Sequence, residues 1–353
     1  MRLVVDARMM GAGKTRGIGR YIKEITDAMR QQMSPSDELL LIQPNIPWYS
    51  IAEQLKMPRI LAKAKADLVW IPHWNVPIFY GCPFAITVHD LLLRHQPASA
   101  KASTRSPFIA WVKRLGHRFI LWQAMKRAAV ILVPTQAVAD DIKQYYPNAV
   151  SRVIVTGEGM TELPKTNVSS ITGKYLLYVG SAYPHKRLDL LVDAWSELSK
   201  QHPDLSLVIT GKDDVFLSRI KSQVQNNGSD RVLFAGSVDD QELGTLYANA
   251  SALIFPSSFE GFGLPPIEAL STGTPVVVSD IPVLREVLPQ NGVFFFKLGD
   301  KDAMIASIEA VLAQGSAARE AASLGGEEVR TRHRWEDAAK RSLAALRAIA
   351  HNH

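Results

Sequence analysis

The chain alternates between short apolar runs and longer stretches in which apolar residues recur every three or four positions. The short runs predict buried strands, and the longer stretches predict amphipathic helices. In the first half, strands are expected at 3–5, 39–42, 68–71, 84–88, 130–133 and 152–155, and helices at about 19–32, 107–127 and 136–145. A second series of strands runs from 175–179 to 293–296, after which only helices are expected. This alternation is typical of βαβ units with parallel sheets, so the fold class is α/β.

The periodicity also predicts the domain organisation. A length of 353 residues favours two domains, each large enough to bury its own core. From 157 to 173 the pattern fades into polar and turn-forming residues, and we interpret 161–173 as a linker. The N-terminal domain is then expected at 1–160 and the second domain at 174–334, followed by a final segment, 335–353, that is helical from Trp335.

One segment of the second half combines several binding features. The apolar run 251–255 predicts a buried strand that leads into a turn containing Gly261 and Gly263, where backbone can approach a ligand closely. Pro265 and Pro266 favour the start of a helix directly after that turn. The N–H groups and the positive dipole end of such a helix bind phosphate.

Two carboxylates lie on either side of this turn. Glu260 precedes it, and Glu268 is expected on the first turn of the following helix. A carboxylate accepts two adjacent hydrogen bonds, which matches the paired hydroxyls of a ribose or a hexose. One segment can thus contact a sugar, a phosphate and a second sugar, which indicates a site for a nucleotide-sugar.

The run 231–288, with 175–195 and the N-terminus, resembles the retaining glycosyltransferases of family 4, in particular mannosyltransferase-like members that build bacterial surface polysaccharides. The two glutamates of that family, seven residues apart, match Glu260 and Glu268. The resemblance covers nearly the whole chain. It implies the GT-B architecture, in which two Rossmann-like, doubly wound domains face each other across a cleft. The donor would lie on the second domain and the acceptor on the first, and the segment 335–353 would cross back to the N-terminal domain.

The resemblance also implies roles for individual residues. Lys186 matches the lysine that binds the donor diphosphate, whereas Ser181 stands where many relatives have an arginine. Arg187, Arg20 or Arg16 would then have to provide the second positive charge at the donor diphosphate.

In relatives, a histidine at the end of the strand that corresponds to 84–88 contacts the donor sugar. His89 occupies this position. The alternative for His89 is a structural pair with Asp90, and the neighbouring His73 is expected on the acceptor side. We therefore expect Glu260, Lys186 and His89 to be catalytic. The expected donor-binding residues are Gly17, Ser181, Lys186, Arg187, Gly211, Val238, Glu260, Gly261, Phe262, Gly263, Leu264 and Glu268.

Three motifs that suggest other chemistry are discounted. The segment 11–15 looks like a phosphate-binding P-loop, but Arg8 occupies the position of its first glycine. Asp300 and Asp302 imitate a metal-binding Asp-X-Asp motif, yet an aspartate before a helix is an ordinary cap. The nine histidines show no metal-ligand spacing. We therefore expect no metal and no cofactor, the nucleotide-sugar donor being a co-substrate.

Composition and charge bear on the location of the protein. A single cysteine, Cys82, suits a reducing compartment, and neither a secretory segment nor a membrane span is recognisable, so we expect a cytoplasmic protein. Residues 1–170 hold 22 Lys and Arg against 12 Asp and Glu, whereas residues 171–353 hold 18 against 22. The first half should therefore prefer an anionic surface.

The basic character of the first half is concentrated around one predicted helix. Between Asp90 and Asp140 there is no acidic residue. Basic and aromatic residues alternate there, which is typical of helices at lipid interfaces. The expected membrane or acceptor surface consists of Arg105, Trp111, Lys113, Arg114, Arg118 and Trp122. The alternative is that the apolar stripe of this helix packs on the sheet of its own domain.

The resulting functional hypothesis is the metal-independent transfer of a hexose, with retention of configuration, from a nucleotide-sugar to a lipid-linked or oligosaccharide acceptor at the inner face of the plasma membrane. The resemblance favours GDP-mannose as donor, with a UDP-hexose as the alternative. A sugar-nucleotide epimerase on the same architecture would need no acceptor. A nucleic-acid partner is not expected, because no RNA-binding motif is recognisable.

Overall fold

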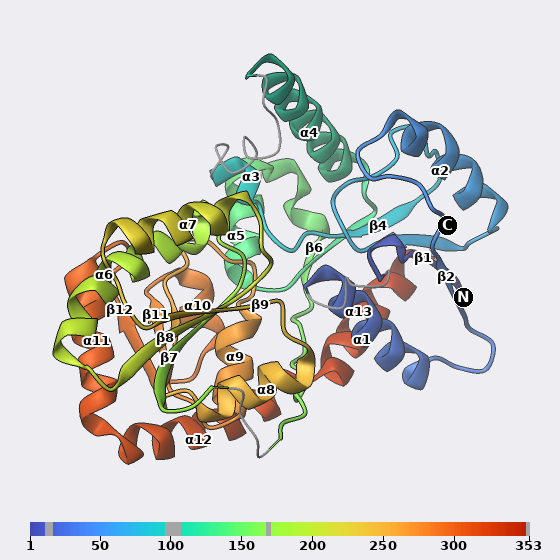
Figure 1. Ribbon diagram of the computed structural model, residues 1–353. Helices are drawn as coiled ribbons and strands as arrows, with labels where there is room; N and C mark the ends of the chain where they lie inside the picture. Colours follow the sequence, from blue (N-terminus) through green and yellow to red (C-terminus); the bar gives the residue numbers. More distant parts are fainter. Residues whose placement is uncertain (11–16, 96–106, 167–170, 351–353) are drawn as a thin grey trace. The chain divides into compact units, whose positions relative to one another are not determined.

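The computed structural model describes residues 1–10, 17–95, 107–166 and 171–350 (Figure 1). The chain forms two compact units, Met1–Gly159 with His333–His353, and Met160–Arg332. Each unit contains one six-stranded sheet in which all strand pairs are parallel. The α/β prediction is thus correct, and each sheet has the open, doubly wound topology of a Rossmann-like fold.

The first sheet contains every strand that the apolar runs predict, with ends that differ by at most one residue. Its strands are β1 (Arg2–Asp6), β2 (Glu38–Ile42), β3 (Leu68–Ile71), β4 (Phe84–Thr87), β5 (Val130–Val133) and β6 (Val153–Val155). Their order is β2-β1-β3-β4-β5-β6, so the direction of winding reverses between β1 and β3. Loops at the carboxyl ends of strands beside such a reversal are the usual ligand positions in open α/β sheets.

The helices of the first unit follow the amphipathic stretches, with two additions that we did not predict, α2 and α3. They are α1 (Ile18–Gln32), α2 (Ile51–Lys63), α3 (Leu92–His95), α4 (Pro107–Arg127), α5 (Gln136–Tyr145) and α13 (Trp335–Ala350), with 3-10 turns at Arg8–Met10 and Pro147–Arg152. Pro58 lies inside α2 and obscures its pattern, although Ser50 caps it by accepting a hydrogen bond from the Glu53 N–H.

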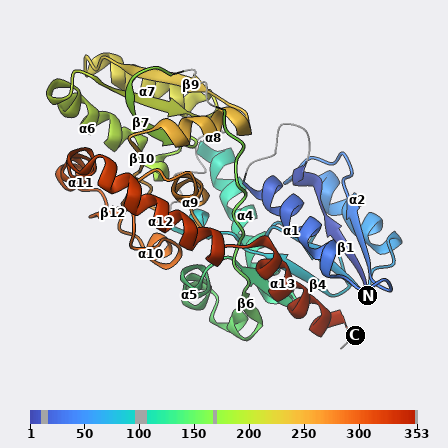
Figure 2. The same cartoon turned by 90° about the horizontal axis from the view of Figure 1, so that it is seen from below.

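The last helix of the chain belongs to the first unit. Figures 1 and 2 both show α13 side by side with α1. Trp335 and Leu346 join Tyr21 and Ile25 of α1 in one buried cluster with the apolar side chains of β1 and β3. The C-terminal segment is therefore part of the core that supports the first sheet.

The second sheet is also doubly wound, but two strands, instead of one, lie beyond its first strand on the shorter side. Its strands are β7 (Lys174–Val179), β8 (Leu205–Thr210), β9 (Val232–Gly236), β10 (Ala252–Phe255), β11 (Val276–Ser279) and β12 (Val293–Phe296). Their order is β12-β11-β10-β7-β8-β9, so the winding reverses between β7 and β10. The loops that follow β7 and β10 therefore begin at neighbouring positions on the same edge of the sheet.

The helices of the second unit are α6 (Leu188–Gln201), α7 (Val215–Asn226), α8 (Asp240–Asn249), α9 (Leu264–Ser271), α10 (Pro282–Val287), α11 (Lys301–Gln314) and α12 (Ser316–Arg332), preceded by a 3-10 turn at Pro184–Lys186. Asp214, Asp239 and Asp300 each cap a helix by accepting backbone N–H bonds. The interpretation of Asp300 as a helix cap is thus confirmed.

The described parts of the segment expected as a linker, 161–166 and 171–173, lie on the second unit. Leu163 and Ile171 pack against the core of this unit, and the Thr166 N–H donates to the Thr245 hydroxyl at 2.9 Å. Polar, turn-rich composition did not reveal these contacts, because they depend on helix α8, which is remote in sequence.

Candidate functional site

The loops that follow β7 and β10 are tied together by hydrogen bonds to one carbonyl. The backbone N–H of Ser258, after β10, donates to the His185 carbonyl at 2.7 Å, and the hydroxyls of Ser258 and Ser257 donate to the same oxygen at 3.0 and 3.2 Å. His185 lies in the loop after β7. The sequence analysis did not include these serines, although they immediately precede the recognised turn. They fix the residue next to Lys186 against the segment that carries Glu260.

The structure brings Lys186 and Glu260 together, although 74 positions separate them. The Lys186 ammonium donates to the Glu260 carboxylate at 2.6 Å. The two side chains remain 19% and 11% exposed, and the ammonium lies 5.3 Å from the centre of the Phe255 ring. A cation and a carboxylate thus meet where the winding of the sheet reverses, with part of each side chain accessible to solvent.

The turn after Glu260 directs the N-terminus of α9 toward the same edge. Gly263 caps this helix with φ 92°, and a Cβ at this position would lie 2.7 Å from the Leu284 side chain. Pro265 and Pro266 occupy the first turn, as predicted, and carry no N–H groups. The N–H groups left at this end of the helix are therefore concentrated around Gly263 and Leu264. Phe262, between the glycines, is buried in the core.

Glu268 is held by a partner that the sequence analysis missed. The Tyr247 hydroxyl, from α8, donates to a Glu268 carboxylate oxygen at 3.0 Å, and both residues are buried. Glu268 is the fifth residue of α9, so the expectation that it lies on the first helical turn was wrong. The prolines were expected to begin the helix, but Leu264 precedes them as its first residue.

Two glycines allow the ends of β7 and β8 to approach. Gly211 follows β8, and a Cβ on it would lie 2.1 Å from the Gly180 carbonyl after β7. Only glycine is compatible with this approach, which leaves backbone surface around Ser181. The Tyr178 hydroxyl donates to the Ser181 carbonyl at 2.7 Å, and burial raises the pKa of Tyr178, which therefore remains a neutral donor. Val238, after β9, is buried next to the helix cap Asp239.

The candidates for a second positive charge differ in their surroundings. Arg187 adopts a left-handed conformation, φ 52°, directly after Lys186, and its guanidinium approaches Asp189 at 3.4 Å. Arg20 is buried in the first turn of α1 in the other unit. Arg16 lies outside the described residues. Arg187 is therefore the candidate that shares a loop with Lys186.

In the first unit, the predicted residues follow different strands. Gly17 precedes α1 as its N-cap, with φ 61°. His89, after β4, bonds through Nδ1 to Glu158 at 3.0 Å and through Nε2 to the Pro72 carbonyl at 3.2 Å. Both ring nitrogens thus have partners within the unit, and the carboxylate that pairs with His89 is Glu158, whereas the alternative had named Asp90.

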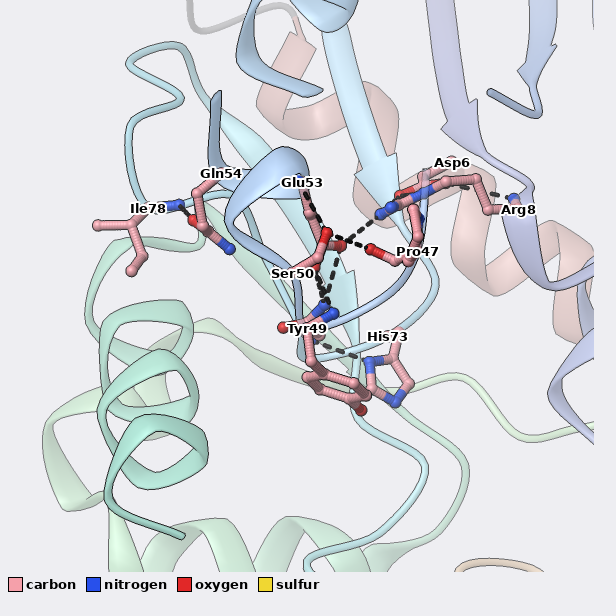
Figure 3. A network of polar contacts seen from close by, with 10 residues as sticks. Asp6, Arg8, Pro47, Tyr49, Ser50, Glu53, Gln54, His73 and Ile78 are labelled. Carbon is pink, nitrogen blue, oxygen red and sulfur yellow. Dashed lines mark hydrogen bonds and ion pairs between the residues drawn. The ribbon is translucent and has the colours of Figure 1, made fainter. Parts of the chain in front are cut away.

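His73, after β3, is part of a buried network that the sequence analysis did not anticipate (Figure 3). Arg8 donates to Asp6 and to Glu53, in each case with a shortest distance of 2.7 Å. The Asn75 side chain donates to both oxygens of Glu53 at 2.9 and 3.0 Å. His73 Nδ1 accepts the Asn75 N–H at 2.9 Å, and burial, followed by the nearby His89 and Arg8, lowers the pKa of His73 to about 3.

Four large apolar residues of α4 are exposed between positions 111 and 122. Trp111, Leu115, Phe119 and Trp122 are 45–53% exposed and recur at helical spacing, which defines the α4 stripe. Figure 1 shows α4 projecting from the sheet of its unit. The alternative that the stripe packs on that sheet is therefore wrong. Arg114 and Arg118 lie on the same helix, whereas Arg105 and the side chain of Lys113 lie outside the described residues. Within the described parts of the chain, no helix has the length and hydropathy needed to cross a bilayer.

These arrangements support one kind of chemistry at the second sheet. Lys186, the N–H groups at the start of α9 and Arg187 are suited to a diphosphate. Glu260 and Glu268 can accept pairs of sugar hydroxyl groups. Among the described residues, no group of three or more His, Cys, Asp or Glu side chains is arranged to hold a metal ion.

Comparison with known families gives the same picture over nearly the entire chain. The model of glycosyl transferases group 1 matches residues 160–341, and that of Glycosyltransferase Family 4 matches residues 35–159. The chain is 29% identical over 270 residues to the O-antigen chain mannosyltransferase RfbU of Salmonella typhimurium, an alignment that covers 74% of this chain and 69% of RfbU.

Solved structures share the fold. Sucrose-phosphate synthase of Thermosynechococcus elongatus superposes with a TM-score of 0.78 at 21% identity, covering 100% of this chain and 99% of that one. Anabaena HepE, in complex with UDP and glucose, superposes with a TM-score of 0.73 at 17% identity, covering 98% and 99%.

Proposed function

Because the chain belongs to the group 1 glycosyl transferases and is a glycosyltransferase, we propose that it transfers a hexose from a nucleoside diphosphate sugar, with retention of anomeric configuration, to a lipid-linked or oligosaccharide acceptor. The observation that carries this proposal is the meeting of Lys186 and Glu260 beside the N-terminus of α9. In the complex with donor, Lys186 contacts the diphosphate, and Glu260 accepts hydroxyls of the transferred hexose. Glu268, positioned by Tyr247, binds the ribose hydroxyls.

The proposed residues act mainly as the glycosidic bond breaks. Negative charge then grows on the departing diphosphate, and fixed positive groups stabilise that charge more strongly in the transition state than in the bound donor. Lys186, Arg187 and the N–H groups around Leu264 provide these positive groups. In the front-face route that we propose, a departing phosphate oxygen accepts the proton of the attacking hydroxyl, and the new bond forms on the face that the leaving group vacates.

Proton NMR of the product tests this mechanism. A retained anomer is expected, with turnover that EDTA does not affect. An inverted anomer, or turnover that EDTA abolishes and a divalent ion restores, would contradict the proposed route.

The similarity of the chain to RfbU, which is named as a mannosyltransferase, supports mannose as the transferred group and GDP-mannose as its donor. A UDP-hexose is the second candidate, supported by the fold that the chain shares with HepE, which was solved with UDP and glucose. A thermal-shift series with GDP-mannose, UDP-glucose, UDP-galactose and UDP-N-acetylglucosamine distinguishes them. Stabilisation by GDP-mannose and not by the UDP-sugars is expected, and the reverse pattern assigns a UDP-hexose. If donor turnover is independent of any added acceptor, an epimerase replaces the transferase proposal.

We also propose that the α4 stripe places the first unit on an anionic membrane, where a lipid-linked acceptor is held. Exposed Trp and Phe side chains insert favourably at the lipid interface, and each nearby Lys or Arg adds about 1 kcal/mol of attraction to anionic headgroups. Flotation with vesicles tests the proposal. Binding should require anionic lipid, weaken with salt, and be lost in Leu115→Asp. Equal binding to neutral vesicles would remove the electrostatic part of this proposal.

A further inference from the structure

A cavity of about 760 Å³ lies in the first unit between the second half of α4 and the segment 145–152. Four basic residues line it, namely Arg94, Arg118, Lys126 and Arg152, and no Asp or Glu side chain is among its lining residues. The nearby Asp141 is paired with His95 at 2.9 Å. The described wall of the cavity is therefore strongly positive, and no carboxylate among its lining residues neutralises it. Such a wall favours the binding of an anion.

The arginines of this wall are held in place from several directions. Arg152 donates to the Met125 carbonyl at 2.7 Å and to the Ala128 carbonyl, which fixes it at the C-terminal end of α4. The Arg94 guanidinium lies 5.1 and 5.6 Å from the rings of Tyr145 and Tyr146, and its buried Nε has no hydrogen-bond partner among the residues that the structure describes.

Arg94 and Arg118 border the same cavity as Tyr146. Their charges oppose the rise that burial causes in the pKa of Tyr146. A planar guanidinium binds the oxygens of a phosphate with paired hydrogen bonds, and two of them in one cavity suit a phosphate group.

The rim of the cavity is part of the α4 stripe. Phe119 and Trp122 line the cavity and are also 47% and 45% exposed on the stripe, with ring centres 6.0 Å apart. The Lys126 ammonium lies 5.2 Å from the Trp122 ring centre. A ligand with a phosphate and an attached apolar chain would contact the basic wall and the rim together, whereas free phosphate would contact the wall alone.

Most of the basic wall lies away from the strand ends at which we expect donor and acceptor chemistry. Met125 and Lys126 precede β5, and Arg152 precedes β6, so these three residues lie beside the amino-terminal ends of those strands, whereas Arg94 lies in α3, which follows β4. His73 and His89 follow the carboxyl ends of β3 and β4. A ligand in the cavity is therefore suited to anchoring the unit and not to reacting.

From these observations we infer that the cavity is a binding site for the phosphate of an anionic phospholipid, whose acyl chains extend from the rim along the α4 stripe. The inference rests on the proposed membrane docking and deepens it: the basic residues form a discrete headgroup site and are not only a diffuse positive surface. One lipid molecule then occupies one site, and binding depends on Arg118 more strongly than on other exposed arginines.

The first test uses the full chain, vesicles of phosphatidylcholine with phosphatidylglycerol, and two matched variants. Arg118→Glu changes the cavity wall, and Arg59→Glu makes the same charge change at an exposed position of α2. Arg118→Glu is expected to weaken binding about tenfold or more, because it loses one attraction and adds one repulsion, and Arg59→Glu less than twofold. Arg118→Lys should retain most of the affinity. Equal losses in Arg118→Glu and Arg59→Glu would overturn the discrete site.

A second test separates this inference from the docking proposal. Monomeric dihexanoyl phosphatidylglycerol, followed by tryptophan fluorescence and thermal shift, should bind wild type and Leu115→Asp alike, and Arg118→Glu at least tenfold more weakly. Inorganic phosphate should bind at least tenfold more weakly than the short-chain lipid. If Leu115→Asp still binds vesicles, the proposal that the α4 stripe docks on the membrane fails. The binding of the short-chain lipid then still tests whether the cavity holds a phospholipid headgroup. Equal affinity for phosphate and lipid, or no binding of the lipid, would overturn the phospholipid assignment.

Discussion

Each unit contains an ion-pair cluster at the corresponding place, beside the strands where its winding reverses. In the first unit, Arg8 follows β1 and pairs with Asp6 and Glu53, and these side chains are at most 2% exposed. In the second unit, Lys186 follows β7 and pairs with Glu260, and both side chains are partly exposed. The same position in one fold therefore carries a closed cluster in one unit and an open pair in the other.

The difference indicates that the closed cluster of Arg8 stabilises the fold, whereas the open pair of Lys186 and Glu260 is suited to binding a ligand. Arg8 is surrounded by two carboxylates, Asn75 donates to one of them, and the Trp48 ring lies 4.0 Å from the guanidinium. A ligand phosphate would have to displace these partners and compensate the desolvation of buried charges. Lys186 pairs with one carboxylate, Glu260, and in the proposed donor complex it would exchange this partner for the diphosphate at lower cost. The open pair is therefore the one to which we assign catalysis.

The largest expected effect is on the closed cluster. Arg8→Met leaves Asp6 and Glu53 buried without their cation, which destabilises the fold by about 3–5 kcal/mol. Chemical denaturation should show this loss, and nucleotide-sugar affinity of the variant should be unchanged below its unfolding transition. A large loss of donor affinity in the folded variant would mean that the closed cluster also binds ligand.

The open pair should show the opposite behaviour. Lys186→Ala or Glu260→Gln is expected to reduce kcat by about 10²–10³, because each removes a group that stabilises developing charge or orients the hexose. Since Lys186 and Glu260 are 19% and 11% exposed, the melting temperature should fall less than in Arg8→Met, whose partners are fully buried. Steady-state kinetics together with calorimetry measure both effects. Near-normal turnover of Glu260→Gln would refute the assigned role.

A smaller effect concerns pH. The pKa of His73 is lowered to about 3 in the folded chain, whereas an unfolded histidine titrates near 6.5. As pH falls below 6.5, the unfolded state binds a proton that the folded state does not, so stability decreases toward pH 3. His73 contributes about 2 kcal/mol to the loss between pH 7 and pH 5. His73→Asn, whose amide oxygen can still accept the Asn75 N–H, should reduce that loss by the same amount in denaturation curves.

His185 provides the comparison in the second unit. Burial, followed by the charge of Lys186, lowers its pKa to about 4. The decrease in stability below pH 6.5 should therefore persist in part in His73→Asn. If the stability of His73→Asn decreased with falling pH as steeply as that of wild type, His73 would not be buried as the network requires.

The smallest effect is expected at Glu268. Tyr247→Phe removes the 3.0 Å hydrogen bond that orients this carboxylate, which costs about 1 kcal/mol of donor binding, or about fivefold in Kd. Because the ribose contact is equally strong in the ground and transition states, kcat should be unchanged. Glu268→Ala should weaken donor binding further, also at constant kcat. Isothermal titration with the nucleotide alone measures both changes, and a fall in kcat with unchanged Kd would contradict a ribose role.

The sequence by itself determined the strands, most helices and the helix caps, because apolar periodicity and capping residues report on local structure. The prolines and glycines between 261 and 266 likewise predicted the turn that begins α9. Their conformational preferences act over a few residues and need no other part of the chain. Helix α2 was missed because the proline within it breaks the local rule.

Only the tertiary structure decided which charges meet and which faces remain exposed. Lys186 and Glu260 are 74 positions apart, and Arg8 and Glu53 are 45 apart, so their pairing follows from strand order and not from any local pattern. The α4 stripe has the same periodicity whether it is buried or exposed, and only the placement of the remaining elements leaves it in contact with solvent. Local preferences thus define the elements, whereas burial and long-range pairing depend on how the sheet orders strands that are distant in sequence.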